Sequence, residues 1–179
     1  MTHVVNIDAL RPLPVGEVVE VLAATPKIAL RDLRLFDLLL AGERTAALRH
    51  GVYLFFDGKG HCVYVGMCSS SHFAHRIGGH FGMSPRYGMN TFLRRAIKDI
   101  GLDQGSYGGY VEGVERIGDY RLLLVDANGT GKKFIRALER LLHIAMRPRL
   151  NFPRGLPATY GAMDDATRFP DAIALCGGP

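Results

Sequence analysis

The chain has 179 residues and a mass of 19.6 kDa, with 47% hydrophobic and 22% charged residues, which is enough for one ordinary domain. This composition is typical of a folded globular protein and excludes an intrinsically disordered chain. The longest apolar run, over 35–41, is interrupted by Asp37 and is far shorter than the roughly 20 residues that a membrane span requires. We therefore expect no membrane partner. We also expect no secretory leader, because the N-terminal residues form neither a basic nor an apolar stretch.

The cysteine content bears on the compartment and on metal binding. Three cysteines, Cys62, Cys68 and Cys176, are an odd number without the spacing of a disulfide framework, which predicts free thiols in a reducing, cytoplasmic compartment. Histidines and cysteines between residues 61 and 80 raise the alternative of a zinc site. Their spacing fits neither a Cys-x2–4-Cys pair nor a Cys2His2 finger, so we do not expect zinc.

The positive charge is concentrated in the middle of the chain. The formal net charge is +5, yet residues 51–154 carry fifteen basic and eight acidic side chains, a net of +7, against zero for 1–50 and −2 for 155–179. Arginine outnumbers lysine seventeen to five, and its planar fork suits phosphate oxygens. A mildly basic balance is by itself most often ordinary surface charge, but its concentration in the middle of the chain raises the odds of a polyanionic partner.

In chain order, the first expected unit is a helical N-terminal extension over 1–50. Apolar residues at helical spacing predict helices over 15–24 and 29–41, and Gly42 marks the end of the second. The polar residues of this extension form no constellation to which we assign chemistry.

A β-hairpin is expected next. The segments 51–56 and 61–66 are rich in β-branched and aromatic residues and flank a turn over 57–60. A two-residue or a four-residue loop would place Tyr53 directly opposite Tyr64, with both hydroxyls on one face of the sheet. A three-residue loop or a bulge would shift this register.

The remaining elements complete an α/β fold of the α+β type, with a small mixed or antiparallel sheet of about three strands flanked by helices. A short helix within 69–81 would place Arg76 and His80 one turn apart on one face. The other expected elements are a helix over 91–100, a glycine-rich connection over 101–113, a strand over 120–127, a helix over 131–146 capped by Thr130, and an irregular tail over 153–179.

The central part of the chain, 51–152, carries a set of residues in a fixed order. They are Gly51-Val52-Tyr53, Tyr64-Val65-Gly66, Arg76, His80, Glu139 and Asn151. In this order and spacing they resemble the GIY-YIG nuclease family, in which a two-tyrosine hairpin precedes an arginine helix, a glutamate helix and an asparagine. Valine replaces isoleucine in both halves of the motif. Arg76 follows Tyr64 by twelve residues rather than about ten, so we expect a longer loop before the arginine helix.

The resemblance implies a metal-dependent endonuclease that hydrolyses DNA phosphodiester bonds. Glu139 would hold one Mg²⁺, or Mn²⁺ in its place, and Arg76 would bind the scissile phosphate. Asn151 would orient the backbone near the glutamate. Each residue also has an ordinary interpretation; Glu139, for example, could pair with Arg136 or Arg140 on its own helix.

Two residues remain open as the group that activates water. Tyr53 is one candidate, although an unperturbed tyrosine pKa of about 10 is poorly placed for a base at neutral pH unless nearby cations lower it. His80 is the other candidate. Tyr64 would position the water or the phosphate by hydrogen bonding.

The partner implied is DNA, most naturally double-stranded or branched. Candidate contacts to its backbone are the basic residues Arg94, Arg95, Lys98, Lys132, Lys133, Arg147, Arg149 and Arg154. The alternative function is a catalytically silent nucleic-acid-binding module on the same fold. The biological role (repair, restriction, mobile element or toxin), the DNA specificity and the oligomeric state are left open by the sequence.

Overall fold

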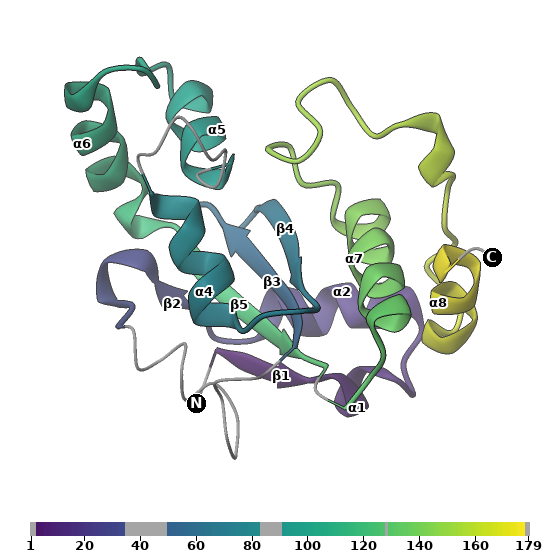
Figure 1. Cartoon of the computed structure of the whole chain (residues 1–179). Coiled ribbons are helices and arrows are strands. Elements are labelled where there is room, and N and C mark those ends of the chain that lie inside the picture. Colours follow the sequence, from purple (N-terminus) through teal and green to yellow (C-terminus); the bar gives the residue numbers. More distant parts are fainter. Residues whose placement is uncertain (1–2, 35–49, 83–90, 128, 178–179) are drawn as a thin grey trace.

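The structure is a computed structural model that describes residues 3–34, 50–82, 91–127 and 129–177 (Figure 1). Within them a five-stranded mixed sheet has the order β1-β5-β3-β4, with β2 also pairing with β5. The strands are β1 (Val4–Asn6), β2 (Ile28–Ala29), β3 (Gly51–Phe56), β4 (Cys62–Cys68) and β5 (Arg121–Asp126). β1 is parallel to β5 and every other pair is antiparallel, which confirms the expected α+β class.

Helices cover both faces of the sheet (Figure 1). One face packs against α1 (Ile7–Leu10), α2 (Val15–Ala24), α7 (Lys132–Met146) and α8 (Phe169–Gly177). The other packs against α4 (Phe73–Gly78), α5 (Thr91–Asp99) and the short 3-10 helices η3 (Gly79–Phe81) and η4 (Ile117–Asp119), with α6 (Tyr107–Arg116) beside α5.

Strand β3 shows how the sequence builds two cores at once. All six of its residues are buried, so the strand lacks the usual alternation of apolar and polar residues. Val52, Leu54 and Phe56 enter the core under α7, whereas Tyr53 and Phe55 enter the core under α4 and α5. Because side chains alternate along a strand, the two tyrosines of the motif belong to the second core only.

The hairpin register differs from the predicted one. The Asp57 N–H donates to His61 O across a three-residue loop in which Gly60 adopts a positive φ of 84°. A second irregularity lies between Phe55 and Phe56, and together they pair Tyr53 with Gly66 instead of Tyr64. The predicted pairing of Tyr53 with Tyr64 is therefore wrong by two residues. An even shift restores the same face, so the two hydroxyl-bearing side chains still share it.

The N-terminal segment is less helical than expected. The helix over 15–24 is confirmed, but residues 4–6 form β1, and residues 28–29 form β2 beside β5. The predicted helix over 29–41 is therefore wrong at its start, where a single 3-10 turn, η1 (Leu30–Asp32), follows β2. Pairing with β5 outweighs local helix propensity here. Residues 35–41 lie outside the described part of the chain.

Two helices were missed, α6 and α8. α6 lies in the segment predicted to be a glycine-rich connection, and two of its glycines have a packing role. A Cβ on Gly113 would overlap the Ile97 side chain, and one on Gly109 would overlap the Asp103 carbonyl. α8 packs against α7, so the irregular tail is wrong for 169–177.

One helix cap also differs. Gly131 occupies the N-cap of α7, and the predicted cap residue, Thr130, instead donates its hydroxyl hydrogen to Ala127 O. Among the described residues, no helix is both long and apolar enough to cross a bilayer.

Candidate active site

Side chains from β3, β4, α4, η3 and α7 meet at the edge of the sheet formed by β4. The Tyr53 and Tyr64 rings are stacked with centroids 6.4 Å apart, and the His80 ring lies 5.5 and 5.3 Å from them. Electrostatic interactions place Arg76 near both tyrosines and Glu139. The rings of Tyr53, Tyr64 and His80 are buried.

Gly66 permits the packing of Tyr53. It lies directly opposite Tyr53 in the β3–β4 ladder, and a Cβ at this position would overlap the Tyr53 ring and hydroxyl. The glycine of the Tyr-Val-Gly motif is thus required by a close approach and not by a special backbone angle. The sequence alone gives no physical reason for this glycine, because the predicted register placed Tyr64, and not Gly66, opposite Tyr53.

His80 is held between a main-chain donor and Tyr53. The Phe92 N–H donates to His80 Nδ1 at 3.3 Å, and His80 Nε2 lies 2.6 Å from Tyr53 Oη. Burial, assisted by the nearby Arg76 and Arg95 charges, lowers the pKa of His80 to about 4, so the ring is neutral near pH 7. A neutral ring that accepts at Nδ1 carries its proton at Nε2. His80 therefore donates to Tyr53 Oη.

Opposing influences act on Tyr53. Burial is the largest and raises the pKa of its hydroxyl above the ordinary value, and Tyr64 and Glu139 act in the same direction. The Arg76 guanidinium lowers the pKa by its charge and by a hydrogen bond to Tyr53. Burial also raises the pKa of Tyr64, against the Arg95 and Arg76 charges. Arg76 is the cation that the tyrosines share.

Glu139 reaches this site from the opposite layer of the fold. α7 packs under the other face of the sheet, but its Glu139 carboxylate accepts a hydrogen bond from the Met67 main-chain N–H on β4. Burial raises the pKa of Glu139 to about 7, although Arg76, the Met67 bond and Arg136 oppose the rise. A desolvated carboxylate of this kind is stabilised in its ionised form by a bound cation.

Asn151 closes the edge of β4. Its Oδ1 accepts from the Val65 N–H and its Nδ2 donates to Val65 O, both at 2.8 Å. His143 Nε2 lies 3.3 Å from the same Val65 oxygen, and the Leu150 N–H donates to Val63 O at 2.9 Å. Asn151 is thus bonded through both amide atoms to the main chain of β4.

The loop before the arginine helix is not the main source of the longer spacing. β4 extends to Cys68, two residues beyond the predicted strand end, and His72 then caps α4 by accepting from the His75 N–H. The longer strand absorbs much of the extra spacing and still directs Arg76 to the site.

Not every predicted DNA contact is available to a phosphate. Arg149 forms ion pairs with Asp57 at 2.9 Å and Asp99 at 3.1 Å. Arg95 donates to the carbonyl oxygens of Leu150 and Asn151. Arg149 is nevertheless exposed, as are the remaining predicted contacts: Arg94 and Lys98 on α5, Lys132 and Lys133 in the first turn of α7, and Arg147 and Arg154 after its end.

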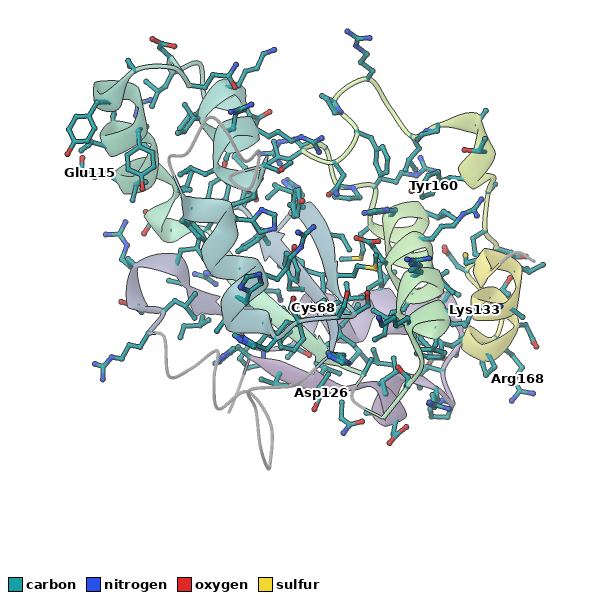
Figure 2. All side chains as sticks on the ribbon, viewed as in Figure 1. Cys68, Glu115, Asp126, Lys133, Tyr160 and Arg168 are labelled. Carbon is teal, nitrogen blue, oxygen red and sulfur yellow. The ribbon has the colours of Figure 1, made fainter. Side chains whose placement is uncertain are left out.

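These exposed cations do not form a single cluster. α7 has 15 residues and so spans roughly 20 Å, which separates Lys132 and Lys133 from Arg147. Figure 2 shows Tyr160 over the C-terminal half of α7, where His143 Nδ1 lies 3.4 Å from its hydroxyl. The cations that act on the catalytic candidates, besides Arg76, are Arg136 on α7, which lowers the pKa of Glu139, and Arg95 on α5, whose charge acts on Tyr64 and His80.

Three cavities are formed by other parts of the described chain, and none of the three is lined by the catalytic candidates. One of about 550 Å³ is lined by residues of 147–162, one of about 490 Å³ lies beside the hairpin loop, and one of about 670 Å³ lies between η1 and α6. Among the described residues no three or more His, Cys, Asp or Glu side chains form a metal-binding group. A cation at this site would have Glu139 as its protein ligand.

Comparison of the chain with family models, with curated proteins and with solved structures finds no match.

Proposed function

We propose that this chain is a metal-dependent endonuclease of the GIY-YIG type that hydrolyses phosphodiester bonds in DNA. The observation that carries the proposal is the convergence of Tyr53, Tyr64, Arg76, His80 and Glu139 at the β4 edge. These residues come from separate parts of the chain, and a structural role for each alone would not require them to meet.

Glu139 fits a divalent cation as a single carboxylate ligand. Mg²⁺ is commonly bound through one or two carboxylates, with water and phosphate oxygens completing its shell. The elevated pKa of Glu139 means that its ionised form lacks sufficient compensation from Arg76 and the Met67 N–H. A Mg²⁺ ion bound there supplies positive charge to the scissile phosphate and to the leaving oxygen.

Arg76 would bind the non-bridging phosphate oxygens. Its guanidinium already acts on Tyr53, Tyr64 and Glu139, so a phosphate beside it would lie among these groups. Arginine suits this role because its charge persists at all relevant pH values and its donors match phosphate geometry. The positive charge also lowers the free energy of the transition state, in which negative charge builds on the phosphate.

Tyr53, as its phenolate, would take the proton of the attacking water. The water oxygen bonds to phosphorus, the bond from phosphorus to the 3′ oxygen breaks, and the leaving oxygen takes a proton from solvent. His80 donates to Tyr53 Oη and so stabilises the phenolate, as does Arg76. Tyr64 would orient the water or the phosphate from the adjacent strand.

The proposal is tested by incubating the protein with supercoiled, linear, branched and single-stranded DNA, with and without Mg²⁺, and mapping the ends. We expect Mg²⁺-dependent nicking with ends of a single chemical type. Binding of DNA without cleavage in Mg²⁺ or Mn²⁺ would support the silent binding module instead. Neither binding nor cleavage would refute both.

A further inference from the structure

The outer edge of β4 is covered by side chains and by one short chain segment. On a strand, the N–H and C=O groups of alternate residues point to the same side. Those of Val63, Val65 and Met67 point away from β3. Val63 O accepts from the Leu150 N–H, and the Asn151 side chain bonds both main-chain groups of Val65. The Met67 N–H donates to the Glu139 carboxylate. The candidate metal ligand and Asn151 are thus neighbours on one edge.

Arg95 holds the segment that supplies two of these contacts. It projects from α5, and its Nη1 donates to Leu150 O at 2.8 Å and Asn151 O at 3.2 Å. Arg95 is partly buried, whereas its neighbour Arg94 on the same helix is exposed. A charged donor bonded to two carbonyls is stronger than a neutral one and restrains both peptides.

Arg149 fixes the same segment from its other end. Its ion pairs join it to Asp57 in the hairpin loop and to Asp99 at the end of α5. The turn after α7 begins with Arg147 in a left-handed conformation, φ 45°, which is uncommon for a residue other than glycine. The three residues 149–151 are therefore bonded to the hairpin loop, to α5 and to β4.

We propose that Arg95 is a positioning residue for DNA cleavage, and not a phosphate contact. By holding the Leu150 and Asn151 carbonyls it keeps Asn151 on Val65, and β4 then presents the Met67 N–H to Glu139. This inference rests on the proposed function for its kinetic consequence, but the structural link from Arg95 to Val65 can be measured without any substrate.

The test compares Arg95→Gln and Arg95→Lys with the matched control Arg94→Gln. Arg95→Gln should lower kcat by about 10-fold or more, the scale typical of groups that orient a metal ligand from a distance, with less than about threefold change in KM and DNA affinity. Arg95→Lys can still donate to a carbonyl and should recover part of kcat. Arg94→Gln should mainly weaken DNA binding. The DNA affinity of the wild type should also fall more steeply with salt than that of Arg94→Gln, because the wild type makes one more phosphate contact.

The second measurement is amide hydrogen exchange in the metal-free proteins. Arg95→Gln should speed exchange at Val65 and Met67 by about 10-fold or more, while Tyr64 and Gly66, whose N–H groups face β3, change little. If Arg95→Gln weakens DNA binding like Arg94→Gln and leaves kcat and Val65 exchange at wild-type values, the inference is wrong. If the wild type cleaves no DNA, the proposed function fails and the exchange data alone decide the role of Arg95.

Discussion

His80 donates a hydrogen bond to Tyr53 Oη across 2.6 Å, and its direction is set by the Phe92 N–H, which occupies the other ring nitrogen. A ring nitrogen that carries a proton cannot accept one. The low pKa of His80, about 4, further weakens it as a base. Of the two candidates that the sequence left open, this hydrogen-bond direction argues against His80 as the base and makes it the group that orients Tyr53. Tyr53 as the base would have to ionise against burial, which raises its pKa in spite of the Arg76 charge.

The pH dependence of cleavage distinguishes these two bases. If Tyr53 accepts the proton, the rate at saturating Mg²⁺ should rise by close to tenfold per pH unit between about pH 7 and 9, because burial keeps the pKa of Tyr53 high. If His80 were the base, its pKa of about 4 would make the rate level above about pH 5. Single-turnover rates from pH 5.5 to 9 make the measurement, and a flat profile contradicts the role of Tyr53.

Replacement of Tyr53 by phenylalanine should abolish cleavage and leave the fold intact. We expect a loss of at least about 100-fold in rate, since general-base catalysis contributes on that order. Stability should fall by about 1–3 kcal/mol because the buried His80 Nε2–H loses its acceptor. The matched control is Tyr110→Phe, which removes a hydroxyl bonded to Phe81 O, 3.0 Å away, outside the set of catalytic candidates. It should lose some stability and retain cleavage.

Glu139→Gln tests the metal ligand. Glutamine keeps the size of the side chain but is a far weaker ligand for a hard cation, so cleavage should fall by at least about 100-fold, or 2.7 kcal/mol. DNA affinity should be unchanged or tighter, because one negative charge leaves the site. The control is Glu115→Gln on the exposed surface of α6, which should behave as the wild type. Near wild-type cleavage by Glu139→Gln with Mg²⁺ would remove the central residue of the proposed function.

The same variant should change how stability depends on pH. The pKa of Glu139 is raised in the folded state from 4.5 to about 7, so its contribution to stability is fully present below pH 4.5 and is lost as pH rises through 7. Without metal, Glu139→Gln should therefore gain stability relative to the wild type, by on the order of 2 to 3 kcal/mol, between pH 4.5 and 8. Urea unfolding in a chelator at pH 4.5, 6 and 8 measures this difference.

His80 contributes with the opposite sign. Its pKa is lowered in the folded state, so its contribution is present above pH 6.5 and is lost as pH falls toward 4. This contribution is common to the wild type and Glu139→Gln, and it cancels when the two are compared. A constant difference between the two proteins across pH would show that Glu139 ionises with an ordinary pKa.

Periodicity predicted the features of the site that depend on alternation. The two tyrosines share a face because a strand has a period of two, and this survives a register shift of two residues. Arg76 and His80 lie one turn apart and both act on Tyr53, even though the helix changes to a 3-10 turn at Gly79. The shared faces are local relations and can be predicted from the sequence, whereas the contact of the helix with Tyr53 depends on the fold.

Relations that depend on long-range contacts could not be predicted. In the sequence, Arg95 and Arg149 cannot be distinguished from arginines that bind phosphate. Only the fold brings the Leu150 carbonyl to Arg95 and the Asp57 carboxylate to Arg149. Similarly, Gly109 and Gly113 suggest a loop by composition, but in the fold the Asp103 carbonyl and the Ile97 side chain leave no room for a Cβ at these two positions. Residues 28–29 pair with Arg121 and Leu122 at the start of β5, before the part of β5 that pairs with β1. No local pattern in the sequence indicates this pairing.

Asn151→Asp tests whether the edge of β4 depends on both atoms of the asparagine amide. Oδ1 accepts from the Val65 N–H and Nδ2 donates to Val65 O. Aspartate keeps the first bond, but its second carboxylate oxygen replaces the donor Nδ2 and lies against the Val65 carbonyl oxygen. We expect a loss of about 2–3 kcal/mol at pH 8, the scale of an unsatisfied buried acceptor plus a partly buried charge.

A matched control for Asn151→Asp is available in the same chain. Asn6 caps α1 through its Oδ1 alone, which accepts from the Asp8 N–H, so Asn6→Asp should stay within about 0.5 kcal/mol of the wild type. At low pH the new carboxyl at position 151 takes up a proton and can donate to Val65 O. Its pKa is then raised in the folded state, and the lost stability should return as pH falls below about 5. Urea unfolding of both variants from pH 4 to 8 measures the two effects. Equal stability of Asn151→Asp and Asn6→Asp at pH 8 would mean that the Nδ2 bond to Val65 contributes nothing to holding the edge.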